Sequence, residues 1–335
     1  MGHIGKQTIV FKNPPNILEV YSCVGPKEAS GPLGSYFDQK FEDELLGEDT
    51  WEKAEGELIN RTIQGLLNKA GKQPGDIAYI FSGDLQNQVI ASTFGIKDFN
   101  IPFFGLYGAC STFGESICLA SMAVAGGMTD CVIAGTSSHN CAAEKQFRFP
   151  MEYAGQRMLT QQWTVTGSGY VIITKNGTGP KIQSITPGKM VDFDIKDSFN
   201  MGAAMAPAAV DTIITHLEDT KQKPSDYDAI ITGDLGVCGS DIAVALAKKA
   251  GVDISNVHQD CGKLIYDIQE QDVHSGGSGC GCCASVFTAY FYKQLKEKKI
   301  KKLLLVPTGA LMSPCSTQQG QNIPGIAHAV SIVME

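Results

Sequence analysis

The first candidate for chemistry is Cys110, which stands in the small-residue segment Gly108-Ala-Cys-Ser-Thr-Phe-Gly-Glu115, between an apolar run and a predicted helix. Exposed amides and the dipole at a helix N-terminus stabilise negative charge, so a thiol placed there forms its thiolate more readily. The same amides would hold a bound carboxylate. The segment therefore predicts a nucleophile or an anion-binding pocket at Cys110; the alternative is a small residue that only packs.

Arginine is scarce in this chain, and two of its three arginines, Arg148 and Arg157, lie nine residues apart. A guanidinium binds a carboxylate with two parallel hydrogen bonds, which a lysine does not. We therefore expect Arg148 or Arg157 to bind an anionic ligand near Cys110, with His139 as a further candidate close in sequence. The alternative is that both arginines lie at the surface or at a subunit interface.

Three further cysteines, Cys280, Cys282 and Cys283, stand close together. Their spacing lacks the second pair and the histidine spacing of a zinc site, so we interpret them as packing residues and expect no metal. The sequence has no phosphate loop and no nucleotide-binding glycine pattern, and we expect no cofactor. The remaining candidate acid–base groups are dispersed and are interpreted as structural: His258, His274 and His328.

The elements that would position these residues are duplicated. The run Asp76–Leu85 returns in altered form at Asp226–Leu235, and each copy is an apolar run that ends in Gly-Asp. In both copies a helical stretch, a small-residue segment that opens a helix and a last apolar run follow. Repetition at this long period predicts two duplicated α/β halves, which we place at residues 1–178 and 179–335. Alternating strands and helices predict a mostly parallel sheet with helices on both faces.

Local patterns predict the individual elements of the first half. Apolar and β-branched runs between turn signals predict strands over residues 17–23, 77–82, 102–107, 130–134 and 163–174. Helices are predicted over residues 55–70 and 111–125. Residues 137–162 have no clear period, and such a long irregular segment often carries function or a subunit contact.

Charge and composition limit the function classes. A net charge of −8 argues against non-specific binding of nucleic acid. No run approaches the length of a membrane-spanning helix, and the first residues lack a signal-peptide core, so we expect a soluble chain with reduced cysteines. Residues Lys293–Lys302 contain six lysines in ten positions. They form either a solvated helix C-terminus or a contact with an anionic membrane surface.

Over nearly its whole length the chain resembles the thiolase superfamily, especially its ketoacyl synthase III branch. The resemblance rests on the duplicated halves, the Gly-Ala-Cys opening of a helix and the later segment Gly279-Cys-Gly-Cys-Cys-Ala-Ser285. Within that superfamily, Phe104–Thr112 and Ile231–Gly236 resemble the stage V sporulation protein AD family of spore-forming bacteria. The resemblance implies a five-layered αβαβα homodimer. It also implies a role in moving dipicolinic acid, as its calcium chelate, into the developing spore.

Two departures from the condensing enzymes bear on activity. The histidine that assists the cysteine in those enzymes is replaced here by Gly233, and the asparagine of their Gly-Asn segment is replaced by Cys280. Loss of a general acid–base group costs roughly 10²–10⁴ in rate, and loss of an oxyanion donor costs a comparable factor. The sequence therefore predicts a non-catalytic protein that binds dipicolinic acid. We expect the ligand pocket to include Cys110, His139, Arg148, Arg157, Gly233, Asp234, Cys280 and His328.

Two alternatives remain open at this stage. The chain could be an active acyltransferase that uses Cys110, with His258, His274 or His328 in place of the missing histidine. It could also be a structural subunit of a membrane transport complex that makes its contact through Lys293–Lys302 or Ser137–Gln162. Whether the chain binds dipicolinic acid or serves as a structural subunit, the resemblance places it at the inner membrane of the forespore. Its partners there would be other stage V sporulation A proteins.

Overall fold

The computed structural model describes residues 2–147 and 156–335. Ten of the thirteen strands in its large sheet form two five-strand halves with the same pairing pattern. In each half the two outer strand pairs are parallel and the two inner pairs are antiparallel. The sheet is therefore not mostly parallel, contrary to the prediction from the alternation of strands and helices. From its edge inward, the first half contains β6 (Phe103–Gly105), β5 (Tyr79–Gly83), β7 (Cys131–Ser138), β9 (Gly167–Thr174) and β3 (Asn16–Val24). The second contains β12 (His258–Asp260), β11 (Ala229–Thr232), β14 (Lys302–Val306), β17 (Ala329–Val333) and β10 (Lys181–Thr186).

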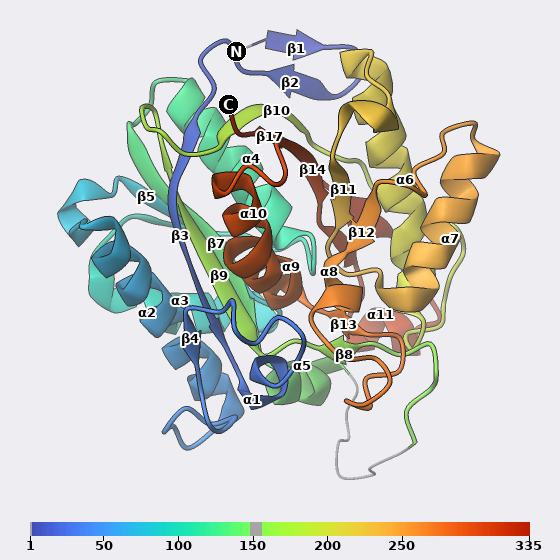
Figure 1. Ribbon diagram of the computed structural model, residues 1–335. Coiled ribbons are helices and arrows are strands. Elements are labelled where there is room, and N and C mark those ends of the chain that lie inside the picture. The colour runs from blue at the N-terminus through green and yellow to red at the C-terminus, as the bar shows by residue number, and fades with distance from the viewer. Residues whose placement is uncertain (1, 148–155) are drawn as a thin grey trace.

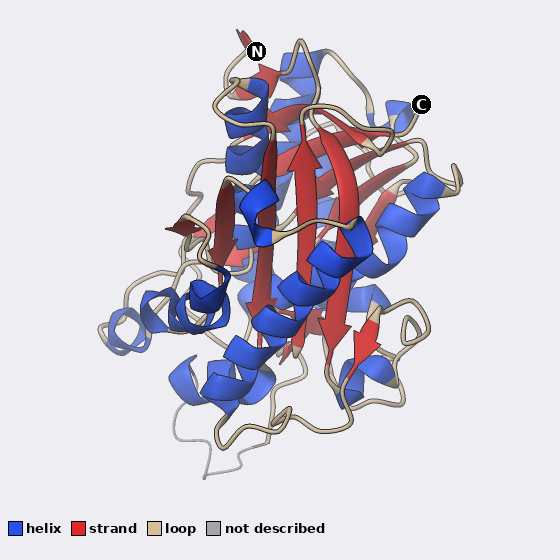
Figure 2. Cartoon of the chain, turned by 90° about the vertical axis from the view of Figure 1, so that its left-hand side faces the viewer, coloured by secondary structure: helices blue, strands red, loops and turns tan. Residues whose placement is uncertain are grey.

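Three helical layers enclose the two halves of the sheet (Figures 1 and 2). The outer face of the first half is covered by α2 (Trp51–Ala70) and α3 (Ile90–Ile96), and that of the second half by α6 (Met201–Thr220) and α7 (Gly236–Lys249). The central layer contains α4 (Thr112–Ala125) and α9 (Cys280–Val286), both rich in small residues. The five-layered αβαβα arrangement that the sequence predicted is thus present.

Helix α2 shows how local sequence sets an element. Thr50 caps its first turn by accepting a hydrogen bond from the Lys53 amide, and Gly71 ends it in the left-handed region with φ 63°. The helix therefore begins four residues before the predicted start at Glu55. Its inner face is apolar and packs on the first half of the sheet, with buried Leu58, Ile59, Ile63, Leu66 and Leu67.

Two predictions for the segment after β7 need correction. Residues 137–162 were expected to be irregular, but they include the end of β7 and helix α5 (Asn140–Phe147). Residues 163–174 were expected to form one strand, but β8 (Trp163–Thr164) pairs with β13 (Gly277–Ser278) outside the large sheet, and only β9 joins that sheet. At the break, the Thr166 amide donates to the buried carboxyl group of Glu28 (3.0 Å) and not to a neighbouring strand.

The remaining elements are short and lie around this framework. They are β1 (Gly2–Ile4), β2 (Thr8–Val10), α1 (Pro26–Ala29), β4 (Gln39–Lys40), α8 (Cys261–Leu264), α10 (Tyr292–Lys296), β15 (Thr308–Ala310), α11 (Pro314–Gln318) and β16 (Gly325–Ala327). Across residues 2–147 and 156–335, no helix combines the length and apolar character needed to cross a membrane.

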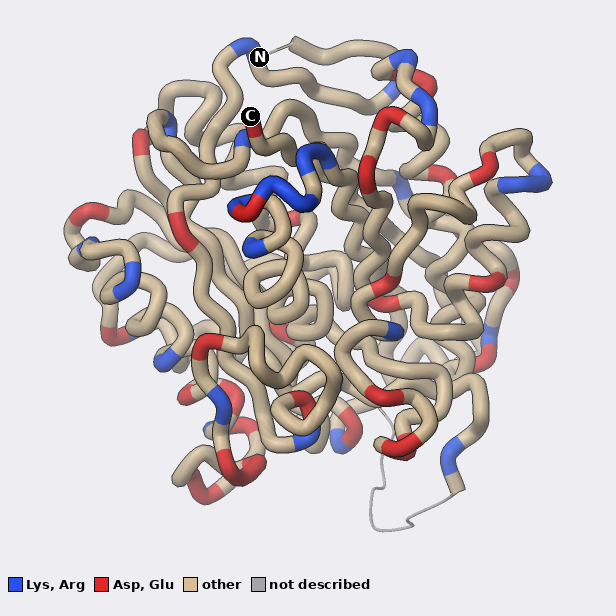
Figure 3. Tube along the Cα trace, in the orientation of Figure 1, with Lys and Arg blue, Asp and Glu red and all other residues tan. Residues whose placement is uncertain are grey.

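The lysine-rich segment lies at the end of α10 and in the turn to β14, where Figure 3 shows a concentration of basic residues. Part of its charge is engaged within the protein. Lys299 pairs with Glu297 (2.8 Å), Lys293 lies over the Tyr36 ring, and Lys302 lies over the Tyr227 ring.

Candidate functional site

Cys110 lies in a tight turn between β6 and α4 that both halves of the protein hold in place. The preceding residue, Ala109, has φ 50°, a left-handed conformation that a non-glycine residue adopts only when its surroundings impose it. Gly309 of the second half packs against this turn, because a Cβ at that position would lie 2.2 Å from the Gly108 carbonyl oxygen. Two amides at the start of α4 are used inside the turn, since Ser111 donates to Gly108 and Thr112 donates to Ala109.

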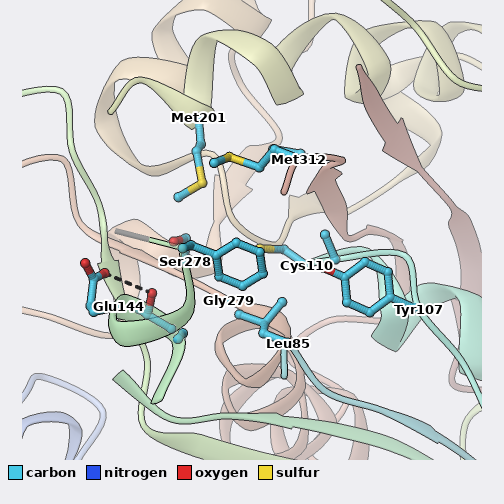
Figure 4. A pocket seen from close by; sticks show the side chains of 13 residues that line it. Leu85, Tyr107, Cys110, Glu144, Met201, Ser278, Gly279 and Met312 are labelled. Atoms are coloured by element: carbon cyan, nitrogen blue, oxygen red, sulfur yellow. Dashed lines mark hydrogen bonds between the residues drawn. The ribbon is translucent and has the colours of Figure 1, made fainter. Parts of the chain in front are cut away.

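Cys110 is 5% exposed and lines a pocket with about 470 Å³ of space outside protein atoms, part of which is open to solvent. The part of this space that can hold the centre of a water molecule measures about 40 Å³, whereas sites that bind small molecules usually measure roughly 300–1,000 Å³. A ligand the size of an aromatic ring therefore requires the lining side chains to move. The lining is mostly apolar and comes from both halves: Leu85, Tyr107, Ala109, Cys110, Ala143, Glu144, Phe147, Thr164, Met201, Ser278, Gly279, Ala310 and Met312. Figure 4 shows Met201 and Met312 on one side of the pocket and Leu85 on the opposite side.

The polar groups of the pocket lie at the end away from Tyr107. Figure 4 shows Glu144 and Ser278 on one side, with Cys110 and Tyr107 on the other. The Thr164 hydroxyl donates a hydrogen bond to Glu144 (3.5 Å). Among the lining residues that the structure describes, Glu144 is the one with a charged side chain, and none is Lys, Arg or His. This lining suits a ligand with an apolar body and polar atoms at one end.

Packing fills both positions at which the condensing enzymes have their catalytic partners. Gly233 follows β11, and a Cβ there would lie 2.8 Å from Cys283 Cβ and 3.2 Å from Pro307 Cα. Cys280 begins α9, is fully buried and donates its thiol proton to the Ser137 carbonyl (3.0 Å). Its neighbours are apolar, so it belongs to the core around the pocket. Neither position supplies a group that could accept a proton from Cys110.

The repeated Gly-Asp motif places one buried carboxyl group in each half, and their surroundings differ. Asp84 accepts hydrogen bonds from the amides of Gln86 (2.9 Å) and Ser92 (2.8 Å). In the second half, the amides of Leu235 and Gly236 donate to Asp260 instead. Both oxygens of Asp234 are therefore without a hydrogen-bond partner in the described part of the chain. Burial, and then the nearby Asp260, raise the pKa of Asp234 well above its usual value, which favours the neutral acid.

The predicted histidines do not line the pocket in the residues that the structure describes. His139 is buried, and its Nε2 donates to the Glu44 carbonyl (2.7 Å). Burial lowers the pKa of His139, with partial compensation by Glu44. His328 Nδ1 accepts from the Gly188 amide (3.2 Å), and burial lowers its pKa to about 4. Both rings are thus interpreted as neutral structural groups, which do not attract an anion.

The two other histidines proposed to replace the missing base also have partners elsewhere. His258 Nε2 forms a hydrogen bond with the Thr232 hydroxyl (2.9 Å), and burial lowers its pKa to about 4. His274 Nδ1 donates to the Met158 carbonyl (2.8 Å). Neither is among the residues that line the Cys110 pocket.

The structure does not bring Arg157 to the pocket. Arg157 Nη2 donates to the backbone carbonyl (2.6 Å) and carboxylate (2.7 Å) of Asp272, and the guanidinium lies 4.9 Å from the centre of the Trp163 ring. The guanidinium that was expected to bind a ligand carboxylate thus pairs through Nη2 with an internal acid, Asp272, which is 115 residues away in the sequence. The other candidate, Arg148, lies outside the described residues.

Comparison with known proteins gives a family match over nearly the whole chain. A family model described as Stage V sporulation protein AD (SpoVAD) matches residues 5–333. Stage V sporulation protein AD from Bacillus subtilis (strain 168) is 44% identical over 326 residues, which cover 97% of this chain and 96% of that protein.

Solved structures with low sequence identity share the fold. The 3-oxoacyl-[acyl-carrier-protein] synthase III from Aquifex aeolicus VF5 is 14% identical, with a TM-score of 0.59 over 95% of this chain and 99% of that chain. Cerulenin-bound OleA from Xanthomonas campestris is 10% identical, with a TM-score of 0.60 over 97% of this chain and 98% of that chain. The thiolase-like fold expected from the resemblance is therefore confirmed.

Proposed function

The chain belongs to the stage V sporulation protein AD family and is a sporulation protein with a thiolase-like fold; from this we propose that it binds dipicolinic acid in the pocket at Cys110 without catalysing a reaction. The observation that carries the proposal is the pocket itself. It keeps the cysteine, an apolar lining and a polar end, while Gly233 and Cys280 stand where the catalytic partners of the condensing enzymes would be.

The non-catalytic part of the proposal rests on the absence of a histidine from the described lining of the pocket. A general base must reach the nucleophile directly or through one water. His258, His274 and His328, the candidates for that role, have other partners and do not line the pocket. The acyltransferase alternative is therefore disfavoured.

We further propose that the bound form is the calcium chelate. Free dipicolinate carries two negative charges, and the described lining offers an acidic side chain, Glu144, and no basic one. In the chelate, calcium offsets the charge of the two carboxylates and leaves a planar ring with its oxygen atoms at one end. Calcium prefers oxygen ligands and retains capacity for a further carboxylate, so Glu144 is suited to contact it.

Calorimetric titration with dipicolinate should show saturable binding that is at least tenfold tighter when calcium is present. Replacing Glu144 with Gln should remove most of this calcium effect, because the amide keeps the shape but not the charge that calcium prefers. Glu270→Gln, at an exposed position outside the pocket, is the matched control and should bind as the wild type does. Absence of binding with and without calcium would refute the proposed function.

We propose that a second copy of the chain covers the edge of the sheet at β6. Phe104 on this edge strand is 49% exposed, and Tyr107, which also lines the pocket, is 44% exposed. An exposed edge strand with large apolar side chains is a site for pairing with another chain. Pairing there would also shield the pocket wall at Tyr107.

Replacing Phe104 with Asp should convert the dimer to a monomer, because the partner would have to bury an unpaired charge. Light scattering at micromolar concentration should then give the mass of one chain, 35.8 kDa. Phe193→Asp is the matched control, since Phe193 is 57% exposed but lies on another surface loop. A wild-type protein that is already monomeric would contradict the proposed dimer.

We propose that the chain acts at the inner membrane of the forespore, with other stage V sporulation A proteins, in dipicolinic acid uptake. The basic segment Lys293–Lys302 supports this role as a contact with anionic lipid or with a membrane-bound partner. Co-purification from sporulating cells tests the proposal: the tagged chain should recover these proteins with the membrane fraction. Recovery of the chain alone in the soluble fraction would count against it.

A further inference from the structure

Ser278 has a hydroxyl group that the described part of the protein leaves without a hydrogen bond. Its side chain is 1% exposed, and Oγ has no hydrogen-bond partner among the described residues. The backbone carbonyl of the same residue is satisfied, because it accepts from the Val165 amide (2.8 Å). Buried polar groups in native proteins nearly always have a partner, so an exception calls for a specific explanation.

The backbone holds Ser278 at the wall of the Cys110 pocket. Strand β13 pairs in parallel with β8, and Ser278 lies opposite Thr164, which is also a lining residue. The next residue, Gly279, has φ 101°, and a Cβ there would lie 2.7 Å from Ser138 Oγ. Figure 4 shows the Ser278 side chain between Glu144 and Cys110. Ser278 thus belongs to the wall of the pocket near its polar end, with its hydroxyl oxygen buried.

Further buried oxygens without partners lie next to this position. Gln162 Nε2 donates to the carbonyls of Gly277 (3.3 Å) and Asp234, which fixes the amide beside Ser278. Gln162 Oε1 and both carboxyl oxygens of Asp234 have no partner in the described residues. Neither Gln162 nor Asp234 lines the pocket, so among these groups the Ser278 hydroxyl is the one that belongs to a lining residue.

We propose that Ser278 Oγ donates a hydrogen bond to a carboxylate oxygen of the ligand, and that Ser278 thereby selects ligands with a carboxylate attached to a planar ring. The identity of the ligand rests on the proposed function, whereas the assignment of Ser278 as a ligand contact rests on its burial, its missing partner and its place in the pocket. A hydroxyl suits this role because it donates to a carboxylate without adding a charge to the apolar lining.

Two measurements on Ser278→Ala test the inference. In titrations with pyridine-2,6-dicarboxylate in calcium chloride, Kd should rise about tenfold or more, as expected for a lost hydrogen bond to a charged group. Without ligand, the melting temperature should be unchanged or higher, because the variant no longer buries an unpartnered hydroxyl. Ser240→Ala is the matched control: Ser240 Oγ is also unpartnered and the residue is 2% exposed, but it does not line the pocket. It should bind as the wild type does.

Each outcome decides the inference. Wild-type affinity in Ser278→Ala would overturn it and leave the proposed function intact. A clear fall in the melting temperature of ligand-free Ser278→Ala relative to Ser240→Ala would show a structural hydroxyl and would also overturn it. If the wild-type protein binds no dipicolinate, the proposed function fails. The melting temperatures of ligand-free Ser278→Ala and Ser240→Ala then decide alone whether the Ser278 hydroxyl has a structural role or is a ligand contact.

Discussion

Replacing Gly233 with His should lower the free energy of unfolding by about 3 kcal/mol or more, because the site has no room for a side chain. A Cβ at Gly233 would already lie 2.8 Å from Cys283 Cβ and 3.2 Å from Pro307 Cα. The first of these is a Cβ atom, which does not move when the side chain rotates about χ1, and the second is backbone, so neither can rotate away. The histidine that the condensing enzymes place here is therefore excluded by packing, and its restoration requires changes in at least two other segments.

Chemical denaturation of Gly233→His measures the effect, with Gly75→His as the matched control. A Cβ at Gly75 meets no atom within 4 Å, so that variant should unfold within about 0.5 kcal/mol of the wild type. Intact-mass spectrometry after incubation with acetyl-coenzyme A should show no stable acyl adduct on Cys110 in the wild type or in the Gly233→His/Cys280→Asn double variant. A stoichiometric adduct that disappears in Cys110→Ala would contradict the non-catalytic proposal.

The features that sequence predicted well are those set by local chain geometry. The repeated Gly-Asp motif marks the ends of β5 and β11, which occupy matching places in the two halves of the sheet. The small residues of Gly108–Cys110 are needed because Gly309 of the other half approaches this turn so closely. Such constraints act on the backbone and therefore restrict which residue types can stand at these positions, so the sequence alone indicates them.

The composition of the pocket was harder to predict, because it depends on segments that meet only in the folded chain. Arg157 is close to His139 in sequence, yet its guanidinium pairs with Asp272. Met201 and Met312 have no motif that marks them, and they line the pocket because α6 and the segment after β15 converge on it. The sequence did not indicate Glu144 as a pocket residue, because it did not indicate helix α5, on which Glu144 lies. The buried residues of this short helix are small and give no clear apolar period.

The Gly-Asp repeat also predicts a buried carboxyl group in each half. It places Asp84 and Asp234 at equivalent strand ends, and an acid that directly follows a buried strand is itself often buried. The structure shows both carboxyl groups buried, with pKa values raised chiefly by burial. Next to Asp84 lies Glu55, whose burial no local pattern indicates, because its hydrogen-bond partners Gln86 and Ser137 come from other segments.

Glu55 should make the protein less stable as pH rises, and Glu55→Gln should remove this effect. Burial, and then the nearby Asp84, raise the pKa of Glu55 to about 8, above the value near 4.5 that an exposed carboxyl has. Between these two values the folded protein holds a proton that the unfolded chain releases. The stabilisation is complete below about pH 4 and is lost as pH rises toward 8. From pH 5 to pH 8 this single group should lower the free energy of unfolding by roughly 3 kcal/mol.

Urea denaturation of wild type and Glu55→Gln across this pH range measures the contribution of the Glu55 carboxyl. Glutamine is neutral at every pH and can keep both hydrogen bonds, since its oxygen can accept from Gln86 and its amide can donate to the Ser137 hydroxyl. The two proteins should have similar stability near pH 5 and diverge toward pH 8, with the variant more stable. Glu42→Gln, at an exposed position, should follow the wild-type curve. Parallel curves for wild type and Glu55→Gln would mean that this carboxyl is already ionised in the folded protein at pH 5, held by Gln86 and Ser137 strongly enough to outweigh its burial.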